Sequence, residues 1–189
     1  GLTTGTDYNY ATQVTGVALT TTVGSLSLGP TSACATTTAG LICWGNKVNG
    51  LLGNGQSTGS QSTSAAPAGF TTHANRVYVG ASSACVIKLG ALSCWGLNTY
   101  GQLGDGTTTT QLTPVAISRA SAGVSDVAVG SSSTCAVISG AAKCWGNNTF
   151  GQLGNGNNTI NSAPTTISAA TDGTTFDSGV TDISISSNS

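Results

Sequence analysis

Apolar and polar residues alternate along short segments of the 189-residue chain, and the same alternation returns three times. In each repeat two apolar residues, separated by one position, lead into a glycine, as in Val127, Val129 and Gly130. Such alternation places apolar side chains on one face of a β-strand, and no segment keeps helical spacing for more than one turn. The pattern predicts an all-β chain of short strands bounded by glycine.

Each repeat continues with cysteine, tryptophan and leucine at fixed distances. A cysteine follows the glycine by five residues, and a second cysteine comes nine residues later, directly before a Trp-Gly pair. The tryptophans are 51 and 50 residues apart, and a leucine lies eight residues after each of them. The positions are Cys34, Cys43, Trp44 and Leu52, then Cys85, Cys94, Trp95 and Leu103, then Cys135, Cys144, Trp145 and Leu153. These tryptophans and leucines are predicted to form the core of the repeats, because an aromatic residue at a fixed repeat position is more often core than a ligand platform.

Four strands are expected in each repeat. In the third they fall near residues 125–130, 134–138, 141–145 and 164–167, and the last begins at Pro164, to which Pro67 and Pro114 are expected to correspond. A four-stranded sheet that returns about every fifty residues is typical of a β-propeller blade. We therefore predict propeller-type, four-stranded blades.

Both ends of the chain look like partial repeats. Residues 179–189 repeat the alternating opening, with Ile183 and Ile185 in the apolar positions, and residues 1–14 repeat the close of a blade. We expect a single repeat domain with complete blades at about residues 23–72, 73–122 and 123–175, and partial blades at 1–22 and 176–189. Because the chain starts at Gly1 without a signal segment, it is expected to be a mature product or a section of something longer.

The paired cysteines flank predicted hairpin turns. If the two cysteines of a pair face each other, the loop centres are Leu89-Gly90 and Ser139-Gly140, whereas in the first repeat Gly40 is shifted by one position. We predict structural disulfides, each closing a loop of about ten residues and contributing somewhat under about 3 kcal/mol. Zinc is the first alternative, although its cysteines usually have two to four residues between them, whereas here eight intervene and the only histidine is His73. Free buried thiols in a reducing cell are the second.

Composition narrows the function classes. Charged residues are 6% of the chain, Glu and Met are absent, and the net charge is −1. Nucleic-acid binding requires a basic surface that this chain lacks. No run of eighteen apolar residues occurs, so no membrane insertion is expected. Six evenly spaced cysteines favour an oxidising compartment, and we predict an extracellular or cell-surface location.

Candidates for catalysis are few. One histidine cannot act as a base without an orienting partner, and the serines lack a nucleophile-elbow pattern. Asp172, Asp177 and Asp182 lie close together near the end of the chain and could hold calcium, but their spacing matches no calcium loop. We therefore predict no enzyme activity, no catalytic residue, no cofactor and no metal site.

The third repeat, from Gly130 through Cys144-Trp145-Gly146 to Gly156, closely resembles the regulator of chromosome condensation repeat family, and so does the second, from Gly80 to Gly106. The first repeat is looser, with Leu51 where the others have glutamine. The resemblance covers nearly the whole chain. It implies seven-bladed propellers, and since this chain supplies fewer than four blades, we expect an incomplete or open propeller.

Two departures from the family pattern limit which of the family's properties are expected of this chain. The family commonly has a histidine just before the first cysteine position, where this chain has Ala33, Ala84 and Thr134. The paired cysteines resemble those of secreted bacterial members. The family's best-known role, nucleotide exchange on a small GTPase with chromatin binding, is disfavoured by the missing basic segment and by the cysteine pattern.

Two functional hypotheses remain. The first is a non-enzymatic structural protein of the cell exterior that self-associates through open blade edges into a filament or appendage, because unpaired strand edges are templates for association. Its partners would be other copies of the chain. The alternative is a secreted protein-binding module, similar to an adhesin or inhibitor, that holds an extracellular protein through the loops of the propeller face.

Overall fold

The computed structural model describes residues 21–72, 74–167 and 176–186. Within these ranges it contains three four-stranded antiparallel sheets, and in each sheet the strands are ordered as in the sequence. The strands are β1 (Val23–Leu28), β2 (Ser32–Thr37), β3 (Gly40–Asn46), β4 (Ser60–Ala65), β5 (Arg76–Val79), β6 (Ser83–Lys88), β7 (Ala91–Gly96), β8 (Gln111–Ala116), β9 (Val124–Val129), β10 (Ser133–Ile138), β11 (Ala141–Gly146) and β12 (Asn161–Thr166). Two short 3-10 helices, η1 (Val48–Gly50) and η2 (Ser118–Ala120), lie between strands. The predicted all-β fold with propeller-type blades is confirmed.

The central hairpin of each blade has the predicted register. Cys85 lies opposite Cys94, and the turn residues Leu89 and Gly90 have φ values of 53° and 77°. Two consecutive residues with positive φ match the twist of the flanking strands in a two-residue hairpin. In the first blade the loop is Thr38-Ala39, because Thr37 pairs with Gly40 and its hydroxyl donates to the Gly40 carbonyl at 2.8 Å.

One predicted correspondence in the outer strands is wrong. Pro114 and Pro164 lie inside β8 and β12, each one residue before the partner of the second cysteine. In the first blade that partner is Ala65, so Ser64 takes the proline position and Pro67 lies beyond the end of β4. The fourth strands also begin earlier than predicted, since β12 starts at Asn161, which pairs with Gly146.

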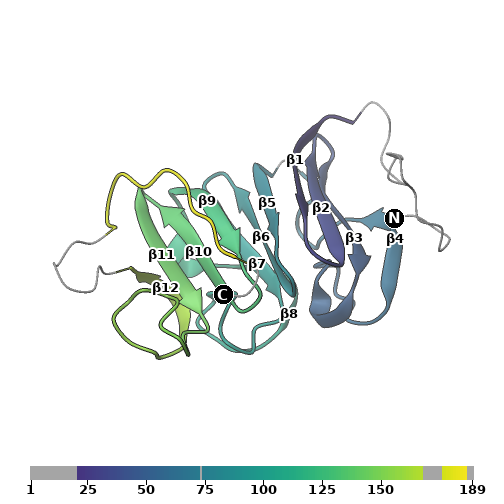
Figure 1. Ribbon diagram of the computed structural model, residues 1–189. Helices are drawn as coiled ribbons and strands as arrows, with labels where there is room; N and C mark the ends of the chain where they lie inside the picture. The colour runs from purple at the N-terminus through teal and green to yellow at the C-terminus, as the bar shows by residue number, and fades with distance from the viewer. Residues whose placement is uncertain (1–20, 73, 168–175, 187–189) are drawn as a thin grey trace.

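The three sheets stack side by side like blades, with β1, β5 and β9 as their inner strands (Figure 1). The apolar core lies between the blades. One cluster joins the cysteine pair of the first blade to Val77, Val79 and Trp95 of the second. Another joins the cysteine pair of the second blade to Val127 and Trp145 of the third. Each blade therefore has a Cys face, which packs on the next blade, and a Trp face, which packs on the preceding one.

The C-terminal segment 176–186 covers part of the Cys face of the third blade (Figure 1). Its Ile183 and Ile185 pack against the cluster of Cys135, Cys144 and Leu153. The backbone N–H of Val180 donates to the Gly140 carbonyl at 2.9 Å, and the segment belongs to none of the three sheets. It thus lies where the inner strand of a fourth blade would lie. The predicted partial blade at 1–22 falls almost entirely outside the described residues.

Candidate functional site

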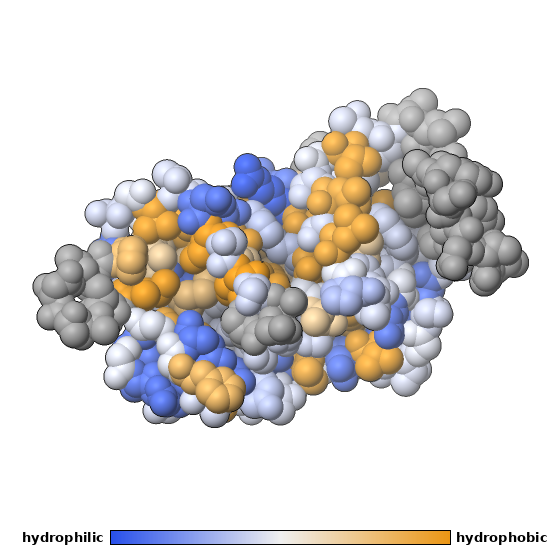
Figure 2. All heavy atoms as spheres, in the orientation of Figure 1, coloured by the Kyte–Doolittle hydropathy of each residue, from blue (hydrophilic) through white to orange (hydrophobic). Residues whose placement is uncertain are grey.

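The Trp face of the first blade exposes apolar side chains of its inner strand, β1. Leu26 and Leu28 of β1 are 56% and 71% exposed, whereas Val77 and Val79, at the same repeat positions of β5, are 2% and 9% exposed. The difference arises because the first blade covers Val77 and Val79, and no described blade covers Leu26 and Leu28. Apolar side chains run along β1 at this end of the stack (Figure 2). Exposed contiguous apolar surface of this kind marks interaction sites in soluble proteins.

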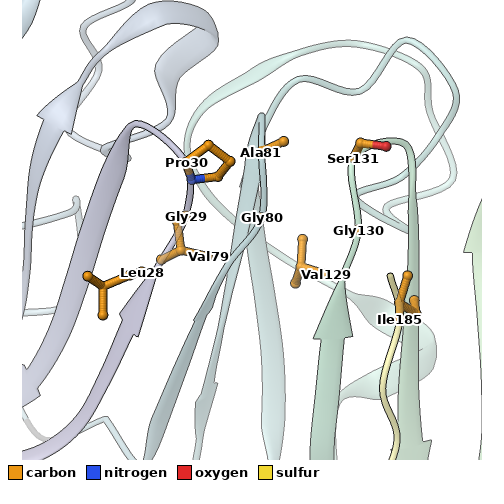
Figure 3. Close-up of a pocket in the computed structure, with 10 residues that line it drawn as sticks. All are labelled: Leu28, Gly29, Pro30, Val79, Gly80, Ala81, Val129, Gly130, Ser131 and Ile185. Atoms are coloured by element: carbon orange, nitrogen blue, oxygen red, sulfur yellow. The ribbon is translucent and has the colours of Figure 1, made fainter. Parts of the chain in front are cut away.

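The inner strands enclose a small hollow near the axis of the stack. It has a volume of about 170 Å³ and lies where β1, β5 and β9 run into Gly29, Gly80 and Gly130, with Ile185 on its far side (Figure 3). Its lining is glycine, proline, serine and aliphatic residues, with no titratable side chain. It therefore offers no acid, base or charged anchor for a substrate.

A small polar network links the inner strands of the second and third blades. The Tyr78 hydroxyl donates to Asp126 Oδ1 at 2.8 Å, and the backbone N–H of Ile183 donates to Asp126 Oδ2 at 3.2 Å. Burial and the bond to Asp126 raise the pKa of Tyr78 to about 12. Burial alone would raise the pKa of Asp126, but its hydrogen bonds from the Tyr78 hydroxyl and the Ile183 backbone outweigh burial and lower it. Arg76 lies 3.7 Å from Asp126 and is largely exposed, so this ion pair contributes little.

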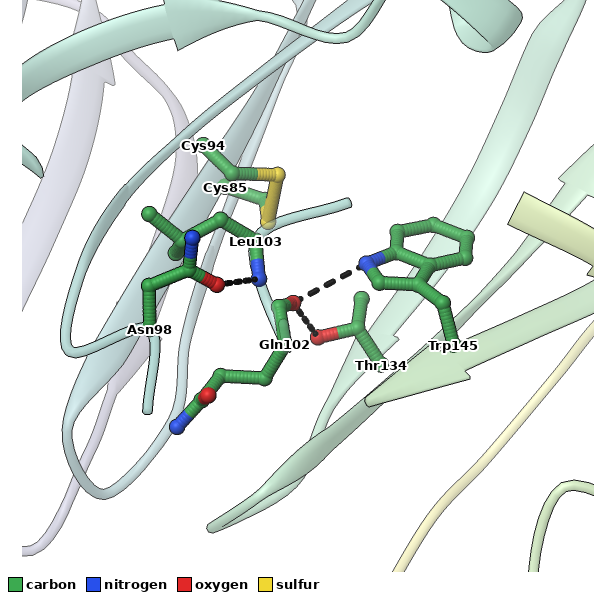
Figure 4. The surroundings of a disulfide bond; sticks show 7 residues. All are labelled: Cys85, Cys94, Asn98, Gln102, Leu103, Thr134 and Trp145. Atoms are coloured by element: carbon green, nitrogen blue, oxygen red, sulfur yellow. Dashed lines mark hydrogen bonds between the residues drawn. A yellow bond between two sulfur atoms is a disulfide. The ribbon is translucent and has the colours of Figure 1, made fainter. Parts of the chain in front are cut away.

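The tryptophans of the second and third blades connect neighbouring blades, as Figure 4 shows for Trp145. Trp145 donates its indole N–H to the Gln102 carbonyl of the preceding blade at 2.9 Å, and Trp95 donates to the Leu51 carbonyl at the same distance. Thr134 also donates to the Gln102 carbonyl, at 2.8 Å. Both indoles are fully buried, whereas Trp44 is only half-buried. Trp95 and Trp145 therefore hold neighbouring blades together, whereas Trp44, also predicted as core, is only half-buried.

Sequence reasoning missed the residue that shapes the loop after each of the last two tryptophans. Asn98 is completely buried, donates to the carbonyls of Thr107 and Thr109, both at 3.1 Å, and accepts from the Leu103 backbone N–H at 2.9 Å. Asn148 makes the same set of bonds in the third blade. The signal was an asparagine three positions after Trp95 and Trp145; in the first repeat Lys47 occupies this position.

The cysteines predicted to form disulfides lie close together in pairs. The cysteine pairs have S–S distances of 2.09, 2.19 and 1.97 Å and Cα–Cα distances of 4.1, 4.1 and 4.0 Å. That these pairs are oxidised in the protein stays a prediction. Leu52, Leu103 and Leu153 are buried.

Within the described ranges no group of His, Cys, Asp or Glu is arranged to hold a metal ion, and no helix is long and apolar enough to cross a membrane. His73 and Asp172 lie outside the described residues.

Solved structures with a similar fold include human WBSCR16, at 21% identity and a TM-score of 0.66, with 77% of this chain and 39% of that chain covered. Prp20p of Saccharomyces cerevisiae, studied for its binding to Gsp1p and histones, matches at 19% identity and a TM-score of 0.64, with 74% and 37% covered. The chain thus spans about two-fifths of the length of these proteins. At this identity the likeness establishes the fold alone. A comparison with curated protein sequences finds no match.

The family assignment comes from the sequence itself. The profile of the regulator of chromosome condensation (RCC1) repeat matches residues 90–137 and 140–188, which together are just over half of the chain. The matched segments contain the Cys-Trp-Gly strands and the glycine-rich loops of the last two blades. The chain belongs to the regulator of chromosome condensation repeat family.

Proposed function

We propose that this chain is a non-enzymatic structural protein of the cell exterior, which self-associates end to end through its open blade faces into a filament or surface appendage. At the coarser level, its RCC1-like propeller fold is that of a protein-binding module. The observation that carries the proposal is the exposure of the β1 side chains on the Trp face of the first blade. Leu26 and Leu28 lie open there, while the equivalent residues of the next blade are buried.

The two end faces are complementary. In the described part of the chain, the Trp face of the first blade meets no other blade, and the Cys face of the third blade meets only segment 176–186. Both internal contacts pack these two kinds of face together, so a second copy offers a surface that the repeat already fits. A contact between unlike faces is heterologous, and such contacts give open polymers when the rotation does not close a ring.

An extracellular location is supported by the three cysteine pairs at disulfide distance, because disulfides persist mainly in oxidising compartments. The low charge is also consistent with a polymer whose subunits pack closely, because few ionised groups would need to be desolvated at the contact.

Sedimentation velocity on the oxidised full chain tests the proposal. The wild type should form concentration-dependent species larger than a monomer, and Leu28→Asp should abolish them, because it places a charge in the contact. The matched control is Leu89→Asp, since Leu89 is 87% exposed at a hairpin tip away from both end faces. A wild type that stays monomeric at about 100 µM, a concentration above the dissociation constants of most specific assemblies, would contradict the proposal.

The alternative, a secreted module that holds another protein through its loops, is favoured by one observation. Tyr100 and Phe150 occupy the same repeat position in neighbouring loops and are 39% and 89% exposed. Exposed aromatic residues are frequent anchors of protein interfaces. A Phe150→Ser variant that loses capture of a protein from the native extracellular medium, while Leu28→Asp retains it, would favour this alternative.

A further inference from the structure

Both internal blade contacts hold an indole in the same way. The acceptor is a backbone carbonyl, of Leu51 or Gln102, in the loop of the preceding blade. Two residues later a glycine with positive φ lies under the indole: a Cβ on Gly53 would be 3.0 Å from Trp95 Nε1, and one on Gly104 would be 2.6 Å from Trp145 Nε1. We call this carbonyl and glycine the indole site of a blade.

The third blade has an indole site without an indole. Its carbonyl is that of Gln152 and its glycine is Gly154, with φ of 62°. The loop is held in the same shape, because Asn148 accepts from the Leu153 N–H at 3.0 Å just as Asn98 does from Leu103. A Cβ on Gly154 would meet only Ile167 Cγ2, at 3.0 Å, in the described structure.

The first blade has an indole without a site. Trp44 extends from β3 on the Trp face, at the repeat position of Trp95 and Trp145. It is half-buried, and its indole N–H makes no hydrogen bond to any of the described residues. A tryptophan N–H at a packed surface usually finds a partner.

We infer that Trp44 of one copy occupies the indole site formed by Gln152 and Gly154 of a second copy. This inference rests on the proposed self-association and specifies its register. The occupant is a second copy because each internal contact pairs these same two elements, and this contact continues the series with the same chemistry. The loop 151–156 carries no charge, so nothing ionic opposes the approach.

Docking in this register requires the C-terminal segment to move. Ile183 and Ile185 pack on the Cys face of the third blade, at the repeat positions of Leu26 and Leu28. The β1 strand of the incoming copy would take the same place. Segment 176–186 therefore competes with the second copy, and weakening its hold should strengthen association.

The test compares substitutions at the two halves of the contact in the oxidised full chain, by sedimentation equilibrium. Trp44→Ala removes the indole, and Gly154→Ala places a methyl group in its site. Gly156→Ala is the matched control, because Gly156 has a similar φ of 78° and a Cβ there would meet nothing within 4 Å. Thermal melts of every variant establish that it is folded. Trp44→Ala and Gly154→Ala should each weaken association at least about tenfold, and Gly156→Ala should change it less than about twofold.

Mixing the two defective variants tests the register directly. Trp44→Ala keeps a free indole site and Gly154→Ala keeps Trp44, so together they should form a one-to-one dimer that neither forms alone and that grows no further. Ile185→Ser should tighten wild-type association severalfold by loosening the competing segment. Association that survives both variants, absence of the mixed dimer, or weaker association of Ile185→Ser would overturn the inference while leaving self-association intact. A monomeric wild type would instead refute the proposed function.

Discussion

Replacing Gly104 by alanine tests the contact that joins the second and third blades. Gly104 has φ of 81°, and an added Cβ would lie 2.6 Å from Trp145 Nε1 and 2.8 Å from Cε2. A residue with a Cβ in this backbone region costs about 1–2 kcal/mol. The methyl group must also push back an indole that is fully buried and hydrogen-bonded to the Gln102 carbonyl.

The displacement adds to the backbone cost. Overpacking of a buried site costs about 1–3 kcal/mol, and a lost indole hydrogen bond about 1 kcal/mol. We expect Gly104→Ala to lower the free energy of unfolding by about 3–6 kcal/mol, taking these contributions together. Gly106→Ala is the control, because Gly106 has φ of 86° and a Cβ there would meet nothing within 4 Å; it should lose only about 1–2 kcal/mol.

Urea unfolding, followed by the far-ultraviolet circular dichroism of the oxidised chain, measures both variants. A double-mutant cycle with Trp145→Leu isolates the contact, since leucine lacks the ring atoms Nε1 and Cε2 that the new methyl group would strike. The cycle should give a coupling free energy of at least about 1 kcal/mol. Equal losses for Gly104→Ala and Gly106→Ala, with no coupling to residue 145, would refute the assignment of the indole to a contact between blades.

Three further predictions concern other parts of the fold. The paired substitution of Cys85 and Cys94 by serine should lower the free energy of unfolding by somewhat under about 3 kcal/mol, and reductant should then shift the urea midpoint of the variant less than that of the wild type. Asn98→Ala should cost about 2–3 kcal/mol, because it leaves the buried Leu103 N–H and the carbonyls of its loop without their partner, and limited proteolysis should then cut that loop faster. The pKa of Tyr78 is raised from 10.0 to about 12 on folding, so its contribution to stability is present below pH 10 and is lost as pH rises towards 12. The lowered pKa of Asp126 has the opposite effect, with a contribution that is present above pH 3.8 and lost as pH falls through the lower, folded value. Urea midpoints measured against pH should show both losses, and Tyr78→Phe should remove the alkaline one.

Local repetition made most of the fold predictable. The hairpin between Cys85 and Cys94 follows from sequence spacing and a glycine, because its contacts lie within ten residues. The partner of Trp145 does not, since the Gln102 carbonyl is 43 residues away and lies in another blade. The repeat predicted that the tryptophans are buried. Alternation along a strand does not show whether a buried side chain packs within its own blade or against a neighbouring one.

The candidate site was only partly predictable. The number of repeats predicted open blade edges. Identifying the exposed Leu26 and the vacant indole site at Gly154 required knowledge of their neighbours in three dimensions. Pro67 was misassigned because the proline of the first repeat lies beyond the end of the outer strand and not inside it. Only the pairing of Cys43 with Ala65 shows that Ser64 takes the proline position. The division into blades at 23–72, 73–122 and 123–175 stays a prediction.

Electron microscopy of the oxidised full chain tests end-to-end association through blade faces. Such association predicts unbranched stacks in which the Cys face of the third blade of one copy meets the Trp face of the first blade of the next, with Trp44 against Gln152. Particles that remain single at every concentration, or that meet through their loops with Leu26 and Leu28 still exposed, would contradict it.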